Sequence, residues 1–280
     1  MSVGADSLTP PMENRAAVAP SIRRSMHGLR NYRQLLLNLV LKDLKLKYRG
    51  SVIGFVWSLA NPLVMVGIYT FAFTKIMPVG SPQFVFYLLL GLLAWTFFAS
   101  SVAMSTSAIA DNGGLLKSVW FPRAILPTAT VLFNLVQYIL TVLVFIPVMV
   151  VYYDVPLVAP MLLFPIFVAL QAAMTIGIAL VLATGTTFFR DIRHLVEVAL
   201  AVLFWATPVI YEVERIPEGV RWIAALSPMT PYVNAYHAVF FYRQWPEAQT
   251  WAATIGYAVV PLVLGLWLIA RHEDQFAELV

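Results

Sequence analysis

Few residues in this 280-residue chain combine the side-chain types and the spacing that catalysis requires. Its four histidines, His27, His194, His237 and His272, are scattered without the spacing of metal ligands, and cysteine is absent. The sequence also lacks a G-x-x-x-x-G-K-[ST] loop that would cradle the phosphates of a nucleotide. We therefore expect no metal site and no cofactor in this chain, and no enzyme activity of the chain alone.

The clearest pattern of charged side chains is a basic stripe within residues 31–50. At about 100° per residue, Lys42, Lys45 and Arg49 share a narrow face with two upstream amide side chains, and leucines occupy most of the remaining circumference. This pattern is typical of a helix in the cytoplasmic membrane interface, with its basic edge toward water and lipid phosphates. The helix is either a simple membrane anchor or an anchor whose exposed edge also binds a soluble partner.

Two further charged segments follow apolar runs. Gly113 and Gly114 permit a sharp turn, after which a short helix ends before Pro122. This segment is either an ordinary loop or a knob that fits another surface, and the Arg190–Asp191 turn either caps helix ends or contacts a partner. The side chains singled out in the first segment are Lys117, Trp120, Phe121 and Arg123.

Aromatic side chains line one face of two apolar runs. They are Phe84, Tyr87, Trp95 and Phe98 in the first run and Phe204 and Tyr211 in the second. Such stripes either pack helices together or anchor them in the interface. The alternative is a carbohydrate path, because the C–H faces of sugar rings stack on aromatic rings.

The elements that must position these residues are membrane helices. Hydrophobic residues make up 60% of the chain and charged residues only 11%, against about 25% in soluble domains, and the mean hydropathy is +0.80. A bilayer core needs roughly 20 apolar residues in a helix, and six runs meet this need approximately. They are Ser51–Thr74, Gln83–Ala110, Ala124–Tyr153, Val155–Phe189, Leu195–Tyr211 and Thr250–Ala270.

Between the fifth and sixth runs, two apolar pieces are too short to cross a membrane. Val220–Leu226 and Tyr232–Tyr242 are separated by Ser-Pro and Thr-Pro pairs, which suits a short re-entrant or interfacial helix pair. The predicted fold class is therefore an all-α integral membrane protein. It has six transmembrane helices, an N-terminal amphipathic interfacial helix, and a re-entrant pair between spans five and six.

Charge asymmetry orients the predicted spans. With the N-terminus in the cytoplasm, fourteen Lys and Arg side chains lie inside and four lie outside, so both termini are predicted to be cytoplasmic. Residues 1–30 are polar and lack the apolar core of a signal peptide, which favours a mobile cytoplasmic tail. Ionisable residues are nearly absent from the spans, and this argues against a membrane enzyme or an ion-coupled carrier.

Several stretches together resemble the permeases of the ABC-2 type transporter family, in particular the branch that exports O-antigen, capsule and teichoic acid. The similarity runs from about residue 30 to the C-terminus, so residues 51–280 are identified as an ABC-2 transmembrane domain. The stretches that carry it are Leu41–Ser51, Gly54–Ser58, Asn61–Leu63, Trp120–Pro127, Phe189–Ile192, Ala206–Tyr211 and Leu226–Pro231.

The resemblance implies a homodimer that works with two copies of an ATP-binding cassette subunit, which holds the ATP and Mg. It implies a polysaccharide or lipid-linked glycan substrate, contact with membrane lipids, no nucleic acid, and a place in the bacterial inner membrane. The runner-up is an ABC-2 exporter of a lipid or small amphiphile. Neither the pattern nor the resemblance names the glycan.

The resemblance also assigns roles to the residues noted above. Those implied to couple to the ATPase are Lys42, Asp43, Lys45, Arg49, Lys117, Trp120, Phe121, Arg123, Arg190 and Asp191. Those implied to line the channel are Trp57, Phe84, Tyr87, Trp95, Phe98, Phe204 and Tyr211. Those implied to form an extracytoplasmic gate are Trp222, Tyr232, Tyr236 and Tyr242.

Overall fold

A computed structural model describes residues 32–49, 56–76, 82–118, 121–152, 154–212, 216–273 and 275. Every regular element within these ranges is a helix, so the all-α prediction is confirmed for the described part of the chain. The predicted cytoplasmic tail, residues 1–30, lies outside the described residues.

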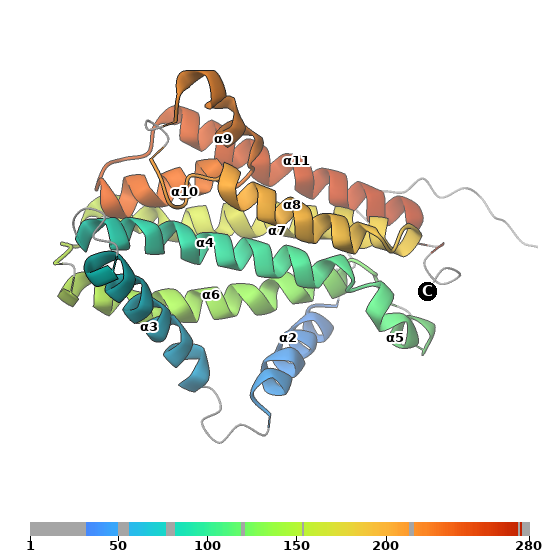
Figure 1. The fold of residues 1–280 in the computed structure, drawn as a ribbon. Helices are drawn as coiled ribbons and strands as arrows, with labels where there is room; N and C mark the ends of the chain where they lie inside the picture. The colour runs from blue at the N-terminus through green and yellow to red at the C-terminus, as the bar shows by residue number, and fades with distance from the viewer. Residues whose placement is uncertain are drawn as a thin grey trace, which may run out of the picture.

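Four helices are long and apolar enough to cross a membrane (Figure 1). They are α4 (Pro82–Thr106), α6 (Ile125–Tyr152), α7 (Phe164–Phe188) and α11 (Ala248–His272). Each has at least 25 residues, and at 1.5 Å per residue this exceeds a hydrocarbon core of about 30 Å. A short 3₁₀ turn, η3 (Ala159–Leu163), leads into α7.

The helices α7 and α11 run parallel to each other. The ring of Phe167 lies 4.6 Å from that of Trp251, and the ring of Phe188 lies 5.3 Å from that of His272, so both pairs are 84 residues apart in sequence. The chain must therefore return along the bundle between the end of α7 and the start of α11. Helix α8 (Ile192–Ala206) makes this return after a tight turn at residues 189–191.

Two glycines let the backbones of α7 and α11 touch. A Cβ atom at Gly177 of α7 would lie 2.3 Å from the backbone N of Leu262. A Cβ atom at Gly265 of α11 would lie 2.5 Å from the carbonyl O of Gly177. Small residues at helix contacts in membranes allow this close approach, which makes α7 and α11 the tightest helix pair described.

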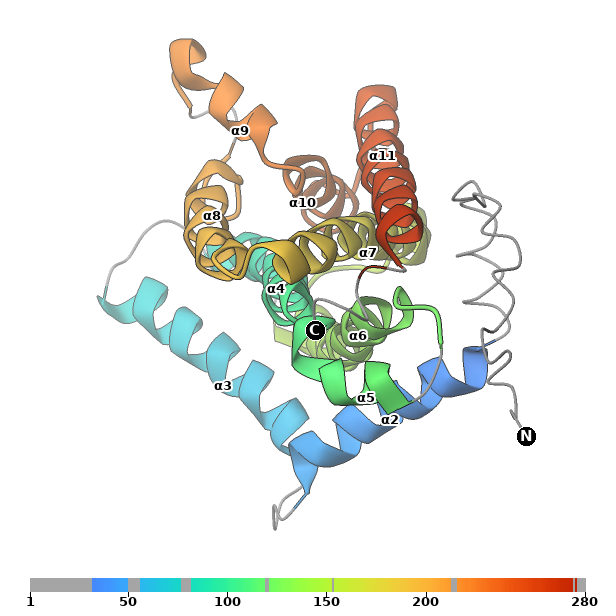
Figure 2. The ribbon, with the colours of Figure 1, turned by 90° about the vertical axis from the view of Figure 1, so that its right-hand side faces the viewer.

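Helices α3 (Val56–Phe71) and α8 have 16 and 15 residues, fewer than the four long helices. A π-helical turn, η1 (Ala72–Ile76), extends α3. Viewed along the bundle, α3 and α8 lie on the same side of α4 (Figure 2). The four long helices are thus established as span candidates by length and composition, whereas α3 and α8 cover the remaining two predicted spans less completely.

Helix α2 (Arg33–Tyr48) covers most of the predicted amphipathic segment and crosses the outside of α6 at one end of the bundle (Figures 1 and 2). The 3₁₀ turn η2 (Ala110–Asn112) and α5 (Gly113–Ser118) follow α4 at that end. A separate apolar core joins these elements to α6, α7 and α11. Its fully buried members include Ile109, Phe121, Ile125 and Ile269.

The segment predicted as a re-entrant pair contains two helices in very different surroundings. The first is η5 (Glu218–Val220) with α9 (Trp222–Leu226), which projects from the bundle (Figure 1). The second is α10 (Thr230–Tyr236) with the π-helical η6 (His237–Phe241), whose side chains are mostly buried in the main core.

Candidate coupling surface and translocation path

The predicted coupling residues that the structure describes come together at one end of the bundle, which we call the coupling end. It comprises α2, the segment 107–124, the turn 189–191 and the last turn of α11. The edge-to-face contact of Phe188 with His272 joins the α7–α8 turn to the end of α11. Residues more than 200 positions apart in sequence thus share one surface.

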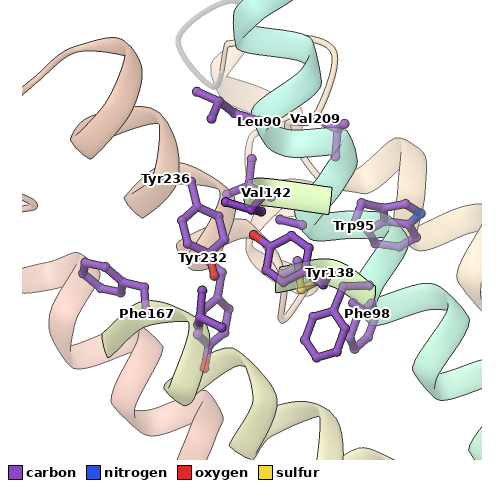
Figure 3. Packing of buried hydrophobic residues seen from close by; sticks show 14 of the residues in the cluster. Leu90, Trp95, Phe98, Tyr138, Val142, Phe167, Val209, Tyr232 and Tyr236 are labelled. Carbon is purple, nitrogen blue, oxygen red and sulfur yellow. The ribbon is translucent and has the colours of Figure 1, made fainter. Parts of the chain in front are cut away.

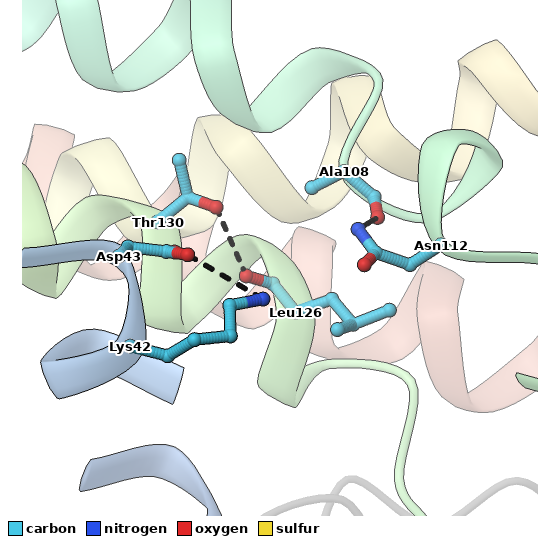
Figure 4. A network of polar contacts seen from close by, with 6 residues as sticks. All are labelled: Lys42, Asp43, Ala108, Asn112, Leu126 and Thr130. Carbon is cyan, nitrogen blue, oxygen red and sulfur yellow. Dashed lines mark hydrogen bonds and ion pairs between the residues drawn. The ribbon is translucent and has the colours of Figure 1, made fainter. Parts of the chain in front are cut away.

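Helix α2 meets this end with its apolar side. Leu39 and Val40 are buried in the core of the coupling end. Lys42, Lys45 and Arg49 are exposed, and the ammonium of Lys42 lies 3.4 Å from the carboxylate of Asp43 beside α6 (Figure 4). An exposed ion pair of this kind contributes about 0–1 kcal/mol, so these charges are available for external contacts at little cost.

One exposed basic residue of α2 bonds to α6 and was missed by the sequence analysis. The ammonium of Lys47 donates a hydrogen bond to the side-chain carbonyl of Gln137 on α6 and lies 5.8 Å from the centre of the Phe133 ring. Partial burial lowers the pKa of Lys47 from its usual value. The sequence does distinguish Lys47 from the other basic residues, because it lies about 200° around the helix from Lys45 and thus outside the basic stripe.

The structure places the side chains of Phe121 and Arg123 inside the chain. Phe121 is 1% exposed and packs in the core of the coupling end. Arg123 is 5% exposed, and its Nη1 donates to the carbonyl of Phe121 at 2.6 Å. These two residues hold the loop to the bundle, and neither side chain is free to contact a partner directly. Trp120 and the side chain of Lys117 lie outside the described residues.

The preceding turn is fixed by its own side chains. The hydroxyl of Ser107 donates to the carboxylate of Asp111 at 2.5 Å. The amide of Asn112 donates to the carbonyl of Ala108 at 2.8 Å (Figure 4). With Ile109 fully buried, this turn has a defined shape, and Asp111 and Gly114 form its exposed tip.

Arg190 and Asp191 are exposed at the turn between α7 and α8. Asp191 stands at the N-cap position of α8, yet its side chain makes no capping hydrogen bond there. The capping alternative for Asp191 is thus not realised in this structure. The turn presents both charges to the surface.

The aromatic face of α4 is buried within the chain, which corrects its assignment as a channel lining. Tyr87, Trp95 and Phe98 are each at most 7% exposed. The ring of Trp95 lies 5.6 Å from that of Phe98 (Figure 3). It also lies 5.5 Å from the ring of Phe204 on α8. Tyr87 stacks on His237 with the ring centres 3.6 Å apart. The packing interpretation therefore holds for these three side chains.

The remaining predicted lining residues lie nearer the surface. Phe84 and Phe204 are half-buried, and Phe84 packs edge to face on Phe73 at 5.4 Å. Tyr211 is half-buried, and its hydroxyl donates to the carbonyl of Trp205 at 2.5 Å. The side chain of Trp57 lies outside the described residues.

Two of the four predicted gate residues are fixed in the core. Figure 3 shows the rings of Tyr232 and Tyr236 in the core. The hydroxyl of Tyr232 donates to the carbonyl of Thr254 at 2.7 Å, and that of Tyr236 donates to Oε1 of Gln171 at 2.7 Å. Gln171 in turn donates to the carbonyl of Ala94 on α4 at 2.9 Å. Helix α10 is thereby tied to α4, α7 and α11, so Tyr232 and Tyr236 are anchors rather than moving gate surfaces.

The other two predicted gate residues are exposed. Trp222 on α9 is 60% exposed and Tyr242 after η6 is 45% exposed. The predicted gate is thus divided between a buried part on α10 and an exposed part at α9 and after η6.

The structure also shows a surface stripe on α4 that the sequence analysis missed. Thr96 and Ala103 are exposed and Ser100 is half-buried, and their spacing of four and three residues puts them on one side of the helix. Small side chains of this kind carry no sequence signal for a sugar path, whereas aromatic rings do. These three positions on the outward side of α4 are thus small and weakly polar, and the exposed Met104 lies next to them.

Comparison with known proteins identifies the family. The family model described as ABC-2 type transporter matches residues 34–241. The chain belongs to the ABC-2 type transporter family. It is 35% identical over 257 residues to the O-antigen export system permease protein RfbA of Myxococcus xanthus, an alignment that covers 91% of this chain and 98% of that relative.

Two proteins of the same printed name from Klebsiella pneumoniae also match. One is 33% identical over 206 residues, which cover 74% of this chain and 80% of the relative. The other is 28% identical over 255 residues, which cover 88% and 95%. The family match, residues 34–241, includes nearly all of α2 and the described elements from α3 to η6, and it ends before α11.

Proposed function

We propose that this chain is the permease subunit of an ABC transporter that exports a lipid-linked polysaccharide across the bacterial inner membrane. The observation that carries the proposal is the match to O-antigen export permeases over nearly their full length. A separate ATP-binding subunit, present in two copies, would bind ATP and Mg and supply the energy.

The parallel α7 and α11 support six spans rather than four. Because both helices are long enough to cross the bilayer and point the same way, the chain between them must cross back once. Helix α8 has 15 residues, about 22 Å at 1.5 Å per residue, and the following turn lengthens its path. Helix α3 with η1 spans Val56–Ile76 and ends where Phe73 meets Phe84 at the start of α4.

Six spans put the coupling end in the cytoplasm. Arg123, Arg190 and Arg271 all lie at the ends of helices on that side, in keeping with the excess of positive charge on cytoplasmic loops. Both termini would then be cytoplasmic, and α9 and α10 would lie toward the opposite side.

Exposed apolar side chains on α3 and α8 support a homodimer. On α8, Leu195, Val198, Val202 and Trp205 are each more than 60% exposed. On α3, Val64, Ile68 and Phe71 are each more than 50% exposed. Lipid can cover either surface alone, but the two lie on the same side of α4 (Figure 2). A second copy packed there would enclose the outward side of α4 between two subunits.

The path for the glycan would follow that outward side of α4. Thr96, Ser100 and Ala103 leave room beside the helix and offer two hydroxyls to sugar groups. In this arrangement the buried aromatic rings of α4 stiffen the wall, and half-buried Phe84 and Phe204 are the aromatic groups nearest the surface.

The coupling end would receive the motion of the ATP-binding subunit. Its accessible charges are Lys42, Lys45 and Arg49 of α2 and the Arg190–Asp191 turn, with the exposed tip of the 107–118 segment beside them. The buried Phe121 and Arg123 would transmit force into α6 rather than contact the partner.

Reconstitution tests the proposed function. The chain, purified with its ATP-binding subunit, is placed in liposomes with the lipid-linked glycan on the coupling-end side. We expect ATP-dependent protection of the glycan from an added glycosidase, and no protection when the phosphate-binding lysine of the ATP-binding subunit is replaced. ATP-driven movement of a lipid or a small amphiphile without glycan would support the runner-up, and no ATP-dependent movement would refute both.

A further inference from the structure

A hydrogen bond joins the end of α11 to the residues just before α6. Glu273 follows directly after α11, and its Oε1 accepts a hydrogen bond from the backbone N–H of Arg123 at 3.2 Å. The two residues are 150 positions apart. The contact lies at the coupling end, where the loop after α5 enters α6.

Glu273 stands where a helix start favours a negative charge. The first N–H groups of α6 are already used, since Ile125 bonds to the carbonyl of Pro122 at 3.1 Å and Leu126 to that of Arg123 at 3.3 Å. Pro127 has no N–H. The carboxylate of Glu273 satisfies the N–H that precedes them and opposes the positive end of the dipole of this 28-residue helix.

The same carboxylate lies beside a residue whose own charge is buried. The guanidinium of Arg123 is nearly inaccessible, and its Nε has no hydrogen-bond partner among the described residues. A buried cation is costly unless negative charge lies nearby. Glu273 accepts from the backbone N–H of Arg123, so its carboxylate acts on the backbone of this residue rather than on the buried guanidinium.

We propose that Glu273 is a positioning residue that latches the end of α11 to the start of α6, so that the elements of the coupling end move as one body. The apolar core beneath the latch already joins α2, the 107–124 segment, α6 and α11 through Val40, Ile109, Phe121 and Ile269. The hydrogen bond between Glu273 and Arg123 adds a polar contact to this apolar core. The inference rests on the proposed function, because the ATP-binding subunit is what would move the elements of the coupling end.

The latch provides a route from the coupling end to the centre of the bundle. Motion applied to α2 or the loop would reach α11 through Arg123 and Glu273. Helix α11 contacts α7 backbone to backbone at Gly177 and Gly265, so it would carry α7 along. Without the latch, the partner can still bind and hydrolyse ATP, but less of the motion reaches the helices.

Hydrogen exchange measured by mass spectrometry on the full complex tests the contact itself. We expect the peptide containing the Arg123 amide to exchange faster in Glu273→Ala than in the wild type. Glu273→Gln keeps an oxygen acceptor but loses the charge, so its exchange should lie between those of the wild type and Glu273→Ala, and Gln275→Ala, at an exposed neighbouring position, is the control. Unchanged exchange in Glu273→Ala would overturn the proposal, and if that variant fails to assemble, faster exchange in Glu273→Gln than in Gln275→Ala takes its place as the test.

Transport measured in the same complexes tests the consequence. Glu273→Ala should lower the amount of glycan exported per ATP hydrolysed several-fold while complex assembly and basal ATP hydrolysis stay near wild type, and Glu273→Gln should fall in between. Faster exchange with an unchanged ratio of export to hydrolysis would overturn the positioning role. A wild-type complex that exports no glycan would instead defeat the proposed function, and the exchange comparison would still decide whether Glu273 holds Arg123.

Discussion

At the scale of single residues, the buried polar side chains of this protein act on the backbones of neighbouring helices. Tyr232, Tyr236 and Gln171 tie α10 to three long helices, and Nε2 of His237 lies 3.0 Å from the carbonyl of Tyr87. In hydrocarbon such groups need a protein partner. The side chains that resembled a sugar gate in the sequence therefore serve packing and hydrogen bonding.

The first prediction concerns Trp95. Because its ring is buried against Phe98 and Phe204, Trp95→Ala should leave a cavity and lower the unfolding free energy in detergent by about 3 kcal/mol. Trp245→Ala, where the native ring is 63% exposed, is the control and should change little. The measurement is thermal or denaturant unfolding followed by fluorescence. Equal stability of the two variants would restore Trp95 to the channel surface.

At the scale of elements, the sequence predicted the long helices and the amphipathic helix well, because charge-free runs and the basic stripe are periodic signals. Its second run, 83–110, covers all of α4 except Pro82, and its third, 124–153, contains α6. The orientation of each helix about its own axis was not predictable. An aromatic stripe in a sequence is compatible both with a packed core and with a sugar path. The contacts of Trp95 in the structure favour the packed core.

The second prediction concerns the contact of α7 with α11. Gly177→Ala places a methyl group where the backbone of Leu262 lies, so the helices must separate, and we expect a loss of about 2 kcal/mol in unfolding free energy. Gly256→Ala on α11 is the matched control, since nothing lies within 4 Å of the added Cβ and alanine favours the helix by up to about 1 kcal/mol. A neutral Gly177→Ala would show that the two helices are not in backbone contact.

At the scale of the whole molecule, one chain leaves a large apolar surface on α3 and α8 beside α4. Three proposals assign this surface and the two ends of the bundle to their surroundings. The dimer assigns the surface of α3 and α8 to a partner, the six spans assign helices to lipid, and the cytoplasmic coupling end assigns one end of the bundle to water. The absence of cysteine from the sequence makes each of them testable with single introduced thiols.

The third prediction tests the dimer. Val202→Cys on α8 should form a covalent dimer in membranes treated with a thiol cross-linker, because residues near a two-fold axis meet their own copies. Val260→Cys on α11, with a similarly exposed native side chain, should stay monomeric. Cross-linking of both to the same extent would indicate random collision rather than an interface.

The fourth prediction tests the orientation. A thiol reagent that cannot cross the membrane should label Leu157→Cys, at the end of the bundle opposite the coupling end, in intact cells. Gln275→Cys should react only after the cells are opened. The reverse pattern would show that the protein has the opposite orientation in the membrane. Labelling of both variants in intact cells would contradict a cytoplasmic position for Gln275.

The close contact between α7 and α11 also has a consequence for how the protein is made. The partners in this contact are 84 residues apart, and synthesis at about 5–20 residues per second separates their appearance by roughly 4–17 s. During that interval the glycine surface of α7 lies in the membrane without α11 packed against it. Helix α11, the last helix among the described residues, thus completes the contact with α7, and a chain truncated before it would expose the glycine surface of α7 to quality control.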